Sequence, residues 1–136
     1  MKLNRVIPAL PVRQIEPAAA FYHTRIGCAV GYQDERFAIV TRDQVEIHLW
    51  AARDESWEAR AGDRPGSPVV TGAESFLAGT ASCRVEVSGI DALYDECKRN
   101  GILYGPDTVV EVRPWGMREF PVLDLDRNLI TFFEPV

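Results

Sequence analysis

Hydrophobic and polar positions in the first half of the chain predict one strand, one helix and three further strands. An apolar run covers 6–12, and apolar side chains at helical spacing follow in 15–26, where Pro17 suits the first turn of a helix. Gly27 comes next and is placed to end that helix in a left-handed conformation. Shorter runs of strand character then predict three strands, at 28–33, 37–42 and 45–50.

The second half repeats this plan about one half-chain later. Residues 83–88 alternate between apolar and polar side chains, and 90–97 has apolar side chains at positions i, i+3, i+4 and i+7, before Gly101. The two halves are in register when Ile15 is placed on Ile90. The strands expected after the second helix cover 109–113, 118–123 and 129–134.

Two βαβββ repeats of this kind predict an α+β fold. One helix on one small sheet would not be stable alone, so the two repeats should lie side by side. We expect curved, mixed half-barrel sheets with the helices on their outer face and a ligand on the concave inner face. We expect a single domain over 1–136, with repeat one at about 5–50, a crossover at about 51–81 and repeat two at about 82–136.

The charge of the chain narrows the choice of partners. The formal net charge of −5 argues against binding to nucleic acid, which requires a basic face. Residues 69–136 carry eleven acidic and six basic side chains, so the second half favours a cationic ligand over an anionic one.

Cysteine usage and the absence of long apolar stretches predict a cytoplasmic protein with no membrane partner. Cys28, Cys83 and Cys97 have neither the even number of a disulfide framework nor a C-x-x-C spacing. The start of the chain lacks the apolar run and cleavage site of a signal peptide. No stretch approaches the roughly 20 apolar residues that cross a bilayer.

The chain has a helix pattern at 15–27 and the runs GIDALY at 89–94, PWGMREF at 114–120 and DLDRN at 124–128. These segments resemble the vicinal oxygen chelate superfamily, which includes glyoxalase I, extradiol dioxygenases and the bleomycin-resistance proteins. The helix pattern and the Asp-x-Asp-x-Asn turn resemble the whole superfamily, and the Pro-Trp-Gly-x-Arg-Glu-Phe run more specifically resembles the bleomycin-resistance branch. The resemblance covers the chain except for the crossover.

The resemblance to that branch implies a protein that binds a bulky, cationic, aromatic-bearing antibiotic without modifying it. It also implies two grooves at the interface of a homodimer, with segments exchanged between subunits. Tyr32, Phe37 and Trp115 then fall on aromatic positions of the groove, and Trp50 stands where the branch tends to have a small polar residue.

The metal-binding positions of the superfamily's enzymes are not filled with donors here. Those enzymes hold a divalent metal with one ligand from each of four strands. Strand alternation predicts that the corresponding positions in this chain are Ile7, Glu46 or His48, Arg84 and Thr131. A guanidinium keeps its proton and repels a cation, and a metal site needs at least three good donors. We therefore expect no metal, no cofactor and no catalytic residue.

Strand alternation also identifies the side chains that face the cavity. Apolar positions of 45–50 should pack under the helix, which turns the intervening residues inward, and the same argument applies to 83–88. Together with the aromatic positions implied by the resemblance, the candidate ligand-binding residues are Tyr32, Phe37, Glu46, His48, Trp50, Arg84, Glu86 and Trp115.

Several of these residues allow two interpretations. Glu46 and Glu86 suit either an acid–base pair or, as we favour, pairing with Arg84 or contact with a cationic ligand. Trp115 lies in a loop and suits either ligand stacking or a dimer contact. Trp50 suits a cavity wall or a core position. In the crossover, Trp57 suits a cap on the groove or a contact with the partner.

The leading hypothesis is a homodimer that sequesters a glycopeptide antibiotic of the bleomycin type, or a related planar aromatic cation. The alternative is a metal-dependent lyase, isomerase or dioxygenase of the same superfamily, with His48 and a carboxylate as ligands. A third hypothesis is a fold relative that binds an unrelated small ligand, because a fold does not determine a function.

Overall fold

The computed structural model describes residues 1–52, 73 and 77–136. Trp57 and most of the expected crossover lie outside the described residues. Within the described part of the chain, no helix is long and apolar enough to cross a membrane.

The first half forms a four-stranded mixed sheet with one helix. Its elements are β1 (Ala9–Val12), α1 (Ile15–Arg25), β2 (Ala29–Gln33), β3 (Phe37–Arg42) and β4 (Val45–Ala51). The strand order is β1-β4-β3-β2, in which β1 runs parallel to β4 and the other neighbours are antiparallel.

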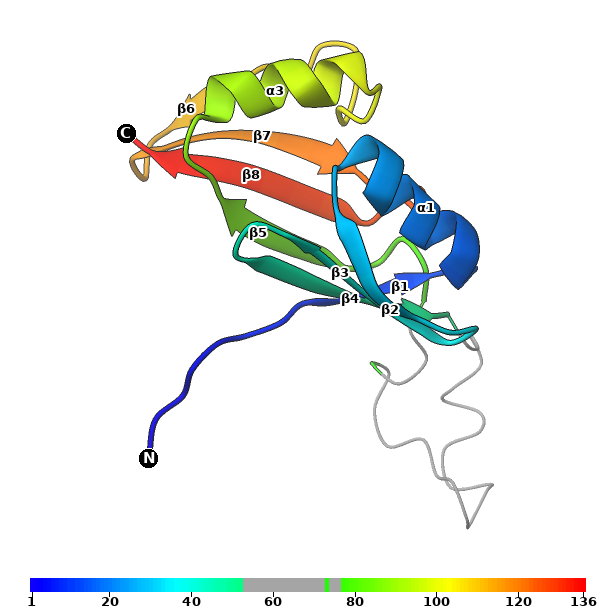
Figure 1. Ribbon diagram of the computed structural model, residues 1–136. Helices are drawn as coiled ribbons and strands as arrows, with labels where there is room; N and C mark the ends of the chain where they lie inside the picture. The colour runs from blue at the N-terminus through cyan, green and yellow to red at the C-terminus, as the bar shows by residue number, and fades with distance from the viewer. Residues whose placement is uncertain (53–72, 74–76) are drawn as a thin grey trace.

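The second half has the same topology. Its elements are β5 (Ser82–Glu86), α3 (Ile90–Arg99), β6 (Glu111–Arg113), β7 (Met117–Leu123) and β8 (Leu129–Pro135). The strand order is β5-β8-β7-β6, with β5 parallel to β8. In Figure 1, α3 lies along β7 and β8, which leaves the other face of this sheet open. The predicted α+β fold of two βαβββ repeats is therefore confirmed.

Alternation along the strands divides each sheet into a helix-facing side and an open side. On β4, Ile47 and Leu49 are buried against the helix side, as predicted, whereas His48 is only partly buried. On β8, Ile130 and Phe132 are buried in the same way. The buried side chains of both halves join in one hydrophobic core, so neither repeat has a core of its own.

A buried polar network joins the two halves. The side-chain amide of Asn128 donates to the backbone oxygen of Pro11 at 2.7 Å and to Asp124 Oδ2 at 3.0 Å. The hydroxyl of Tyr22, on α1, also donates to Asp124 Oδ2 at 2.8 Å. Burial raises the pKa of Asp124 above its ordinary value, and the hydrogen bonds from Asn128 and Tyr22 oppose that shift. The Asp-x-Asp-x-Asn turn thus serves to connect the two repeats.

The first strand is shorter than predicted. It begins at Ala9, after the backbone oxygen of Pro8 accepts a hydrogen bond of 3.0 Å from the backbone N–H of His48, and residues 1–6 before it are exposed (Figure 1). Leu3 and Val6 are 95% and 94% exposed, because no strand of the same chain lies beside them. The apolar run over 6–12 therefore contains both a strand and part of an exposed arm. We call residues 1–6 the arm.

Candidate ligand-binding site

Aromatic side chains line the open face of the first sheet. Phe37 lies opposite Trp50 on the neighbouring strand, and their ring centroids are 4.7 Å apart. The ring of Phe37 also lies 4.9 Å from the imidazole of His48 and 6.0 Å from the ring of Tyr32. We call these four residues the aromatic ladder. Tyr32 is half exposed and the other three are partly buried, so the ladder offers apolar ring surface to a ligand.

Glu46 and His48 form a pair beside the ladder. Nε2 of His48 lies 2.7 Å from Oε2 of Glu46, and Nη1 of Arg5 lies 3.5 Å from Oε1 of the same carboxylate. Of the two outcomes favoured for Glu46, pairing with Arg84 is therefore wrong, and contact with a cationic ligand stays a prediction. Both partners of Glu46 come from the first half of the chain, whereas Arg84 lies on β5 of the other sheet.

Charged side chains gather on the open face of the second sheet. Glu119, on β7, is only 7% exposed. Nη2 of Arg84 donates to Glu119 Oε2 at 2.8 Å, and Nε of Arg113 donates to Oε1 at 3.2 Å. Arg113 also forms an ion pair of 3.0 Å with Glu111. We call these four residues the charged cluster. Its two positive and two negative side chains make it neutral overall.

Strand order explains why Arg84 pairs with Glu119 rather than with Glu86. In the order β5-β8-β7, one strand separates Arg84 from Glu119, and the long arginine side chain reaches across it. On the way, the guanidinium of Arg84 lies 4.9 Å above the ring of Phe133 on β8. Among the described ion pairs Arg84 is joined to Glu119 alone, so the predicted pairing with Glu86 is also wrong.

Trp115 lies in the turn between β6 and β7, next to the charged cluster. The guanidinium of Arg113 lies 5.9 Å from the centre of its ring, and the indole remains 61% exposed. Burial raises the pKa of Glu119, but the hydrogen bond and charge of Arg84, with hydrogen bonds from Arg113 and the indole of Trp115, outweigh it. The pKa of Glu119 therefore lies below its ordinary value, and the carboxylate is ionised near neutral pH.

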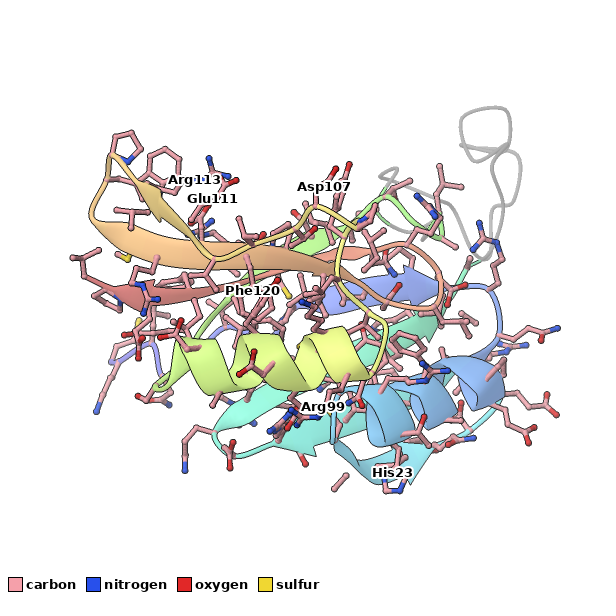
Figure 2. All side chains as sticks on the ribbon, turned by 90° about the horizontal axis from the view of Figure 1, so that it is seen from above. His23, Arg99, Asp107, Glu111, Arg113 and Phe120 are labelled. Carbon is pink, nitrogen blue, oxygen red and sulfur yellow. The ribbon has the colours of Figure 1, made fainter. Side chains whose placement is uncertain are left out.

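A groove with a volume of about 360 Å³ runs along this part of the second sheet. Three acidic side chains and one basic side chain contribute to its walls. In Figure 2, Glu111 and Arg113 lie on one side of the sheet and Phe120 points to the other side, toward α3. The groove is lined by Tyr104, Gly105, Pro106, Asp107, Thr108, Val109, Glu111, Arg113, Glu119 and Pro121.

The eight predicted residues thus fall into two groups, one on each sheet. Tyr32, Phe37, Glu46, His48 and Trp50 occupy the first sheet, whereas Arg84, Glu86 and Trp115 belong to the second half. Sequence analysis missed Glu119, Arg113 and Phe133. Alternation along 117–123 places Glu119 opposite the core residue Phe120 and would have identified it.

The donors on these faces do not fit a metal ion of the kind the superfamily's enzymes use. Among the described residues, no three His, Cys, Asp or Glu side chains lie close enough to hold one. Glu46 and His48 are paired with each other, and Arg84 places a positive charge at another of the expected positions. We derive no metal chemistry from this arrangement.

Curated proteins and solved structures similar to this chain support the fold described above. No family model matches the chain. A bleomycin resistance protein of Geobacillus stearothermophilus is 48% identical over 130 residues, which cover 96% of both chains, and a protein of the same name from Staphylococcus aureus matches equally well. A solved bleomycin-binding protein of Streptomyces verticillus, complexed with copper(II)-bleomycin, has a TM-score of 0.71 and 25% identity, over 97% of this chain and 96% of that one. The chain therefore belongs to the bleomycin resistance protein family.

Proposed function

We propose that this protein binds an antibiotic of the bleomycin type and sequesters it without modifying it. The observation that carries this proposal is the aromatic ladder on the open face of the first sheet. In a family whose members are bleomycin resistance proteins, such a ladder suits the stacking of a planar aromatic group. Capture of this kind requires no bond chemistry, so a catalytic residue is not needed.

The charge of the groove supports a cationic ligand. Asp107, Glu111 and Glu119 face it, and because the charged cluster is neutral overall, the remaining negative charge is that of Asp107. Exposed ring faces add to this preference, because a cation above an aromatic ring is attracted by about 0.5–2 kcal/mol. The aromatic part of the ligand would stack on the ladder while its cationic part lies near the acidic side chains.

We infer that two copies of the chain assemble into a homodimer. The arm carries apolar side chains that find no cover in their own chain, and Leu3 and Val6 are almost fully exposed. A second copy would cover them. In such a dimer the aromatic ladder of one subunit could face the charged cluster of the other. Each binding groove would then be formed by residues of both subunits.

We place the protein in the cytoplasm. Cys28, Cys83 and Cys97 are all free thiols, as is usual in a reducing compartment. We expect neither a nucleic-acid nor a membrane partner there, and the net charge of −5 supports the first of these.

Titration with bleomycin tests the proposed function. We expect saturable quenching of tryptophan fluorescence with a dissociation constant in the micromolar range or below, because Trp50 and Trp115 lie on the two open faces. Mass spectrometry of the recovered bleomycin should give an unchanged mass. Absence of saturable quenching at micromolar ligand, or a changed mass, would contradict binding without modification.

Deletion of residues 1–6 tests the role of the arm. We expect the shortened chain to sediment as a monomer at concentrations where the full chain is a dimer, because Leu3 and Val6 would no longer bury their side chains on a partner. Sedimentation velocity at several concentrations gives the answer. A shortened chain that remains fully dimeric would show that the arm is not needed for assembly.

A further inference from the structure

Glu119 is a buried carboxylate on a face that is otherwise open. Each of its oxygens accepts a hydrogen bond from a different arginine, Arg84 on β5 and Arg113 on β6. These two strands are not neighbours of each other, since β8 and β7 lie between them. Among the described residues, Glu119 is therefore the one that binds both guanidinium groups.

Both arginines also lie against aromatic rings. The guanidinium of Arg84 is 4.9 Å from the ring centre of Phe133, and that of Arg113 is 5.9 Å from the ring centre of Trp115. A hydrogen bond to a carboxylate at one edge of a guanidinium restricts the orientations that the guanidinium plane can adopt. The carboxylate of Glu119 thereby sets where two flat cationic surfaces and one exposed indole lie.

We propose that Glu119, which lines the groove in the second half, is a positioning residue that holds Arg84, beside the groove, as a hydrogen-bond donor for oxygen atoms of the ligand. This inference rests on the function proposed above. The side chain of Arg84 is 48% exposed, and its described hydrogen bonds use one of five N–H groups. The remaining N–H groups suit the carbonyl and hydroxyl oxygens of a glycopeptide. These oxygens are neutral, so they can accept hydrogen bonds from an arginine whose charge is balanced by Glu119.

A neighbouring ion pair provides a comparison. Arg118, next to Glu119 on β7, projects from the opposite side of the strand and pairs with Asp91 of α3 at 2.7 Å. That pair connects the helix to its sheet and touches neither Trp115 nor the groove. A substitution at Arg118 is therefore a matched control for an arginine ion pair without a positioning role.

The first test uses the protein without ligand. In Glu119→Gln, one arginine loses its acceptor, because the amide nitrogen repels the N–H groups that face it. We expect the indole N–H signal of Trp115 and the Nε–H signal of Arg113 to shift in ¹⁵N-resolved NMR spectra, with the indole signal of Trp50 unchanged. Arg118→Lys should move neither tryptophan signal. Unchanged Trp115 and Arg113 signals in Glu119→Gln would overturn the positioning role.

The second test measures affinity for bleomycin by calorimetry. Loss of a hydrogen bond to a charged group predicts about tenfold weaker binding for Glu119→Gln and for Arg84→Lys. The double variant should be no weaker than the weaker single variant, because Glu119 acts through Arg84. Losses that multiply in the double variant, or single variants that bind as tightly as Arg118→Lys, would overturn the subsite.

The two tests separate this inference from the proposed function. If the wild-type protein fails to bind bleomycin, the proposed function and the ligand subsite fall together, whereas the NMR experiment still decides whether Glu119 positions Arg113 and Trp115. If Glu119→Gln does not fold, Arg84→Lys retains the positive charge and leaves Glu119 in place. An unchanged affinity in Arg84→Lys would then overturn the subsite.

Discussion

Replacing Asn128 with alanine is expected to lower the free energy of unfolding by about 3 kcal/mol. Asn128 is fully buried, and its amide donates to the backbone oxygen of Pro11 and to Asp124. It also accepts a hydrogen bond of 3.3 Å from the backbone N–H of Ala81. Alanine would remove these three hydrogen bonds from a buried site, although Asp124 would keep the hydrogen bond from Tyr22. The contact between the two repeats would be weakened as a result.

Asn100→Ala is the matched control for this prediction. Asn100 also connects the two halves, since its amide donates to the backbone oxygen of Arg25 at 3.0 Å, but this hydrogen bond is exposed. Water can replace it, so we expect a loss of about 0.5 kcal/mol. Urea denaturation followed by circular dichroism measures both variants. Equal losses in the two variants would mean that burial is not what makes Asn128 important.

The repeat was predictable because it depends on local periodicity. Apolar residues on the helix side of each strand identified the buried faces, and Ile47 and Leu49 are buried as the alternation requires. The same periodicity could not separate the arm from β1. An apolar side chain such as Val6 is expected to be buried. The sequence does not show whether it is buried by its own chain or by a second copy.

The charged cluster was not predictable from the same pattern. Arg84 and Glu119 are 35 residues apart, and their pairing depends on the strand order β5-β8-β7, which local periodicity does not specify. In sequence, Glu119 stands beside Arg118 and resembles an ordinary surface carboxylate. Alternation along 117–123 places Glu119 on the open face, but its burial follows from two arginines of other strands that cover it, and only the tertiary structure shows that.

Phe37 is expected to contribute most to ligand affinity on the first sheet. We expect Phe37→Ala to weaken the binding of bleomycin about a hundredfold, as for a central aromatic residue of a binding surface. Phe37 contacts the rings of Tyr32, His48 and Trp50, so its removal deprives three neighbours of a packing partner. The aromatic ladder would then lose its order as well as one ring.

Phe21→Ala provides the control for Phe37→Ala. Phe21 lies on α1, packs against the core and contacts Tyr22, so its removal costs stability without changing the open face. We expect this variant to melt at a lower temperature and to bind bleomycin with unchanged affinity. Sedimentation velocity should give the same oligomeric state for both variants, which excludes a loss of binding through a loss of assembly. If Phe37→Ala binds as tightly as Phe21→Ala in the same assembly, the ligand does not stack on the ladder, and the first sheet has to be abandoned as its binding surface.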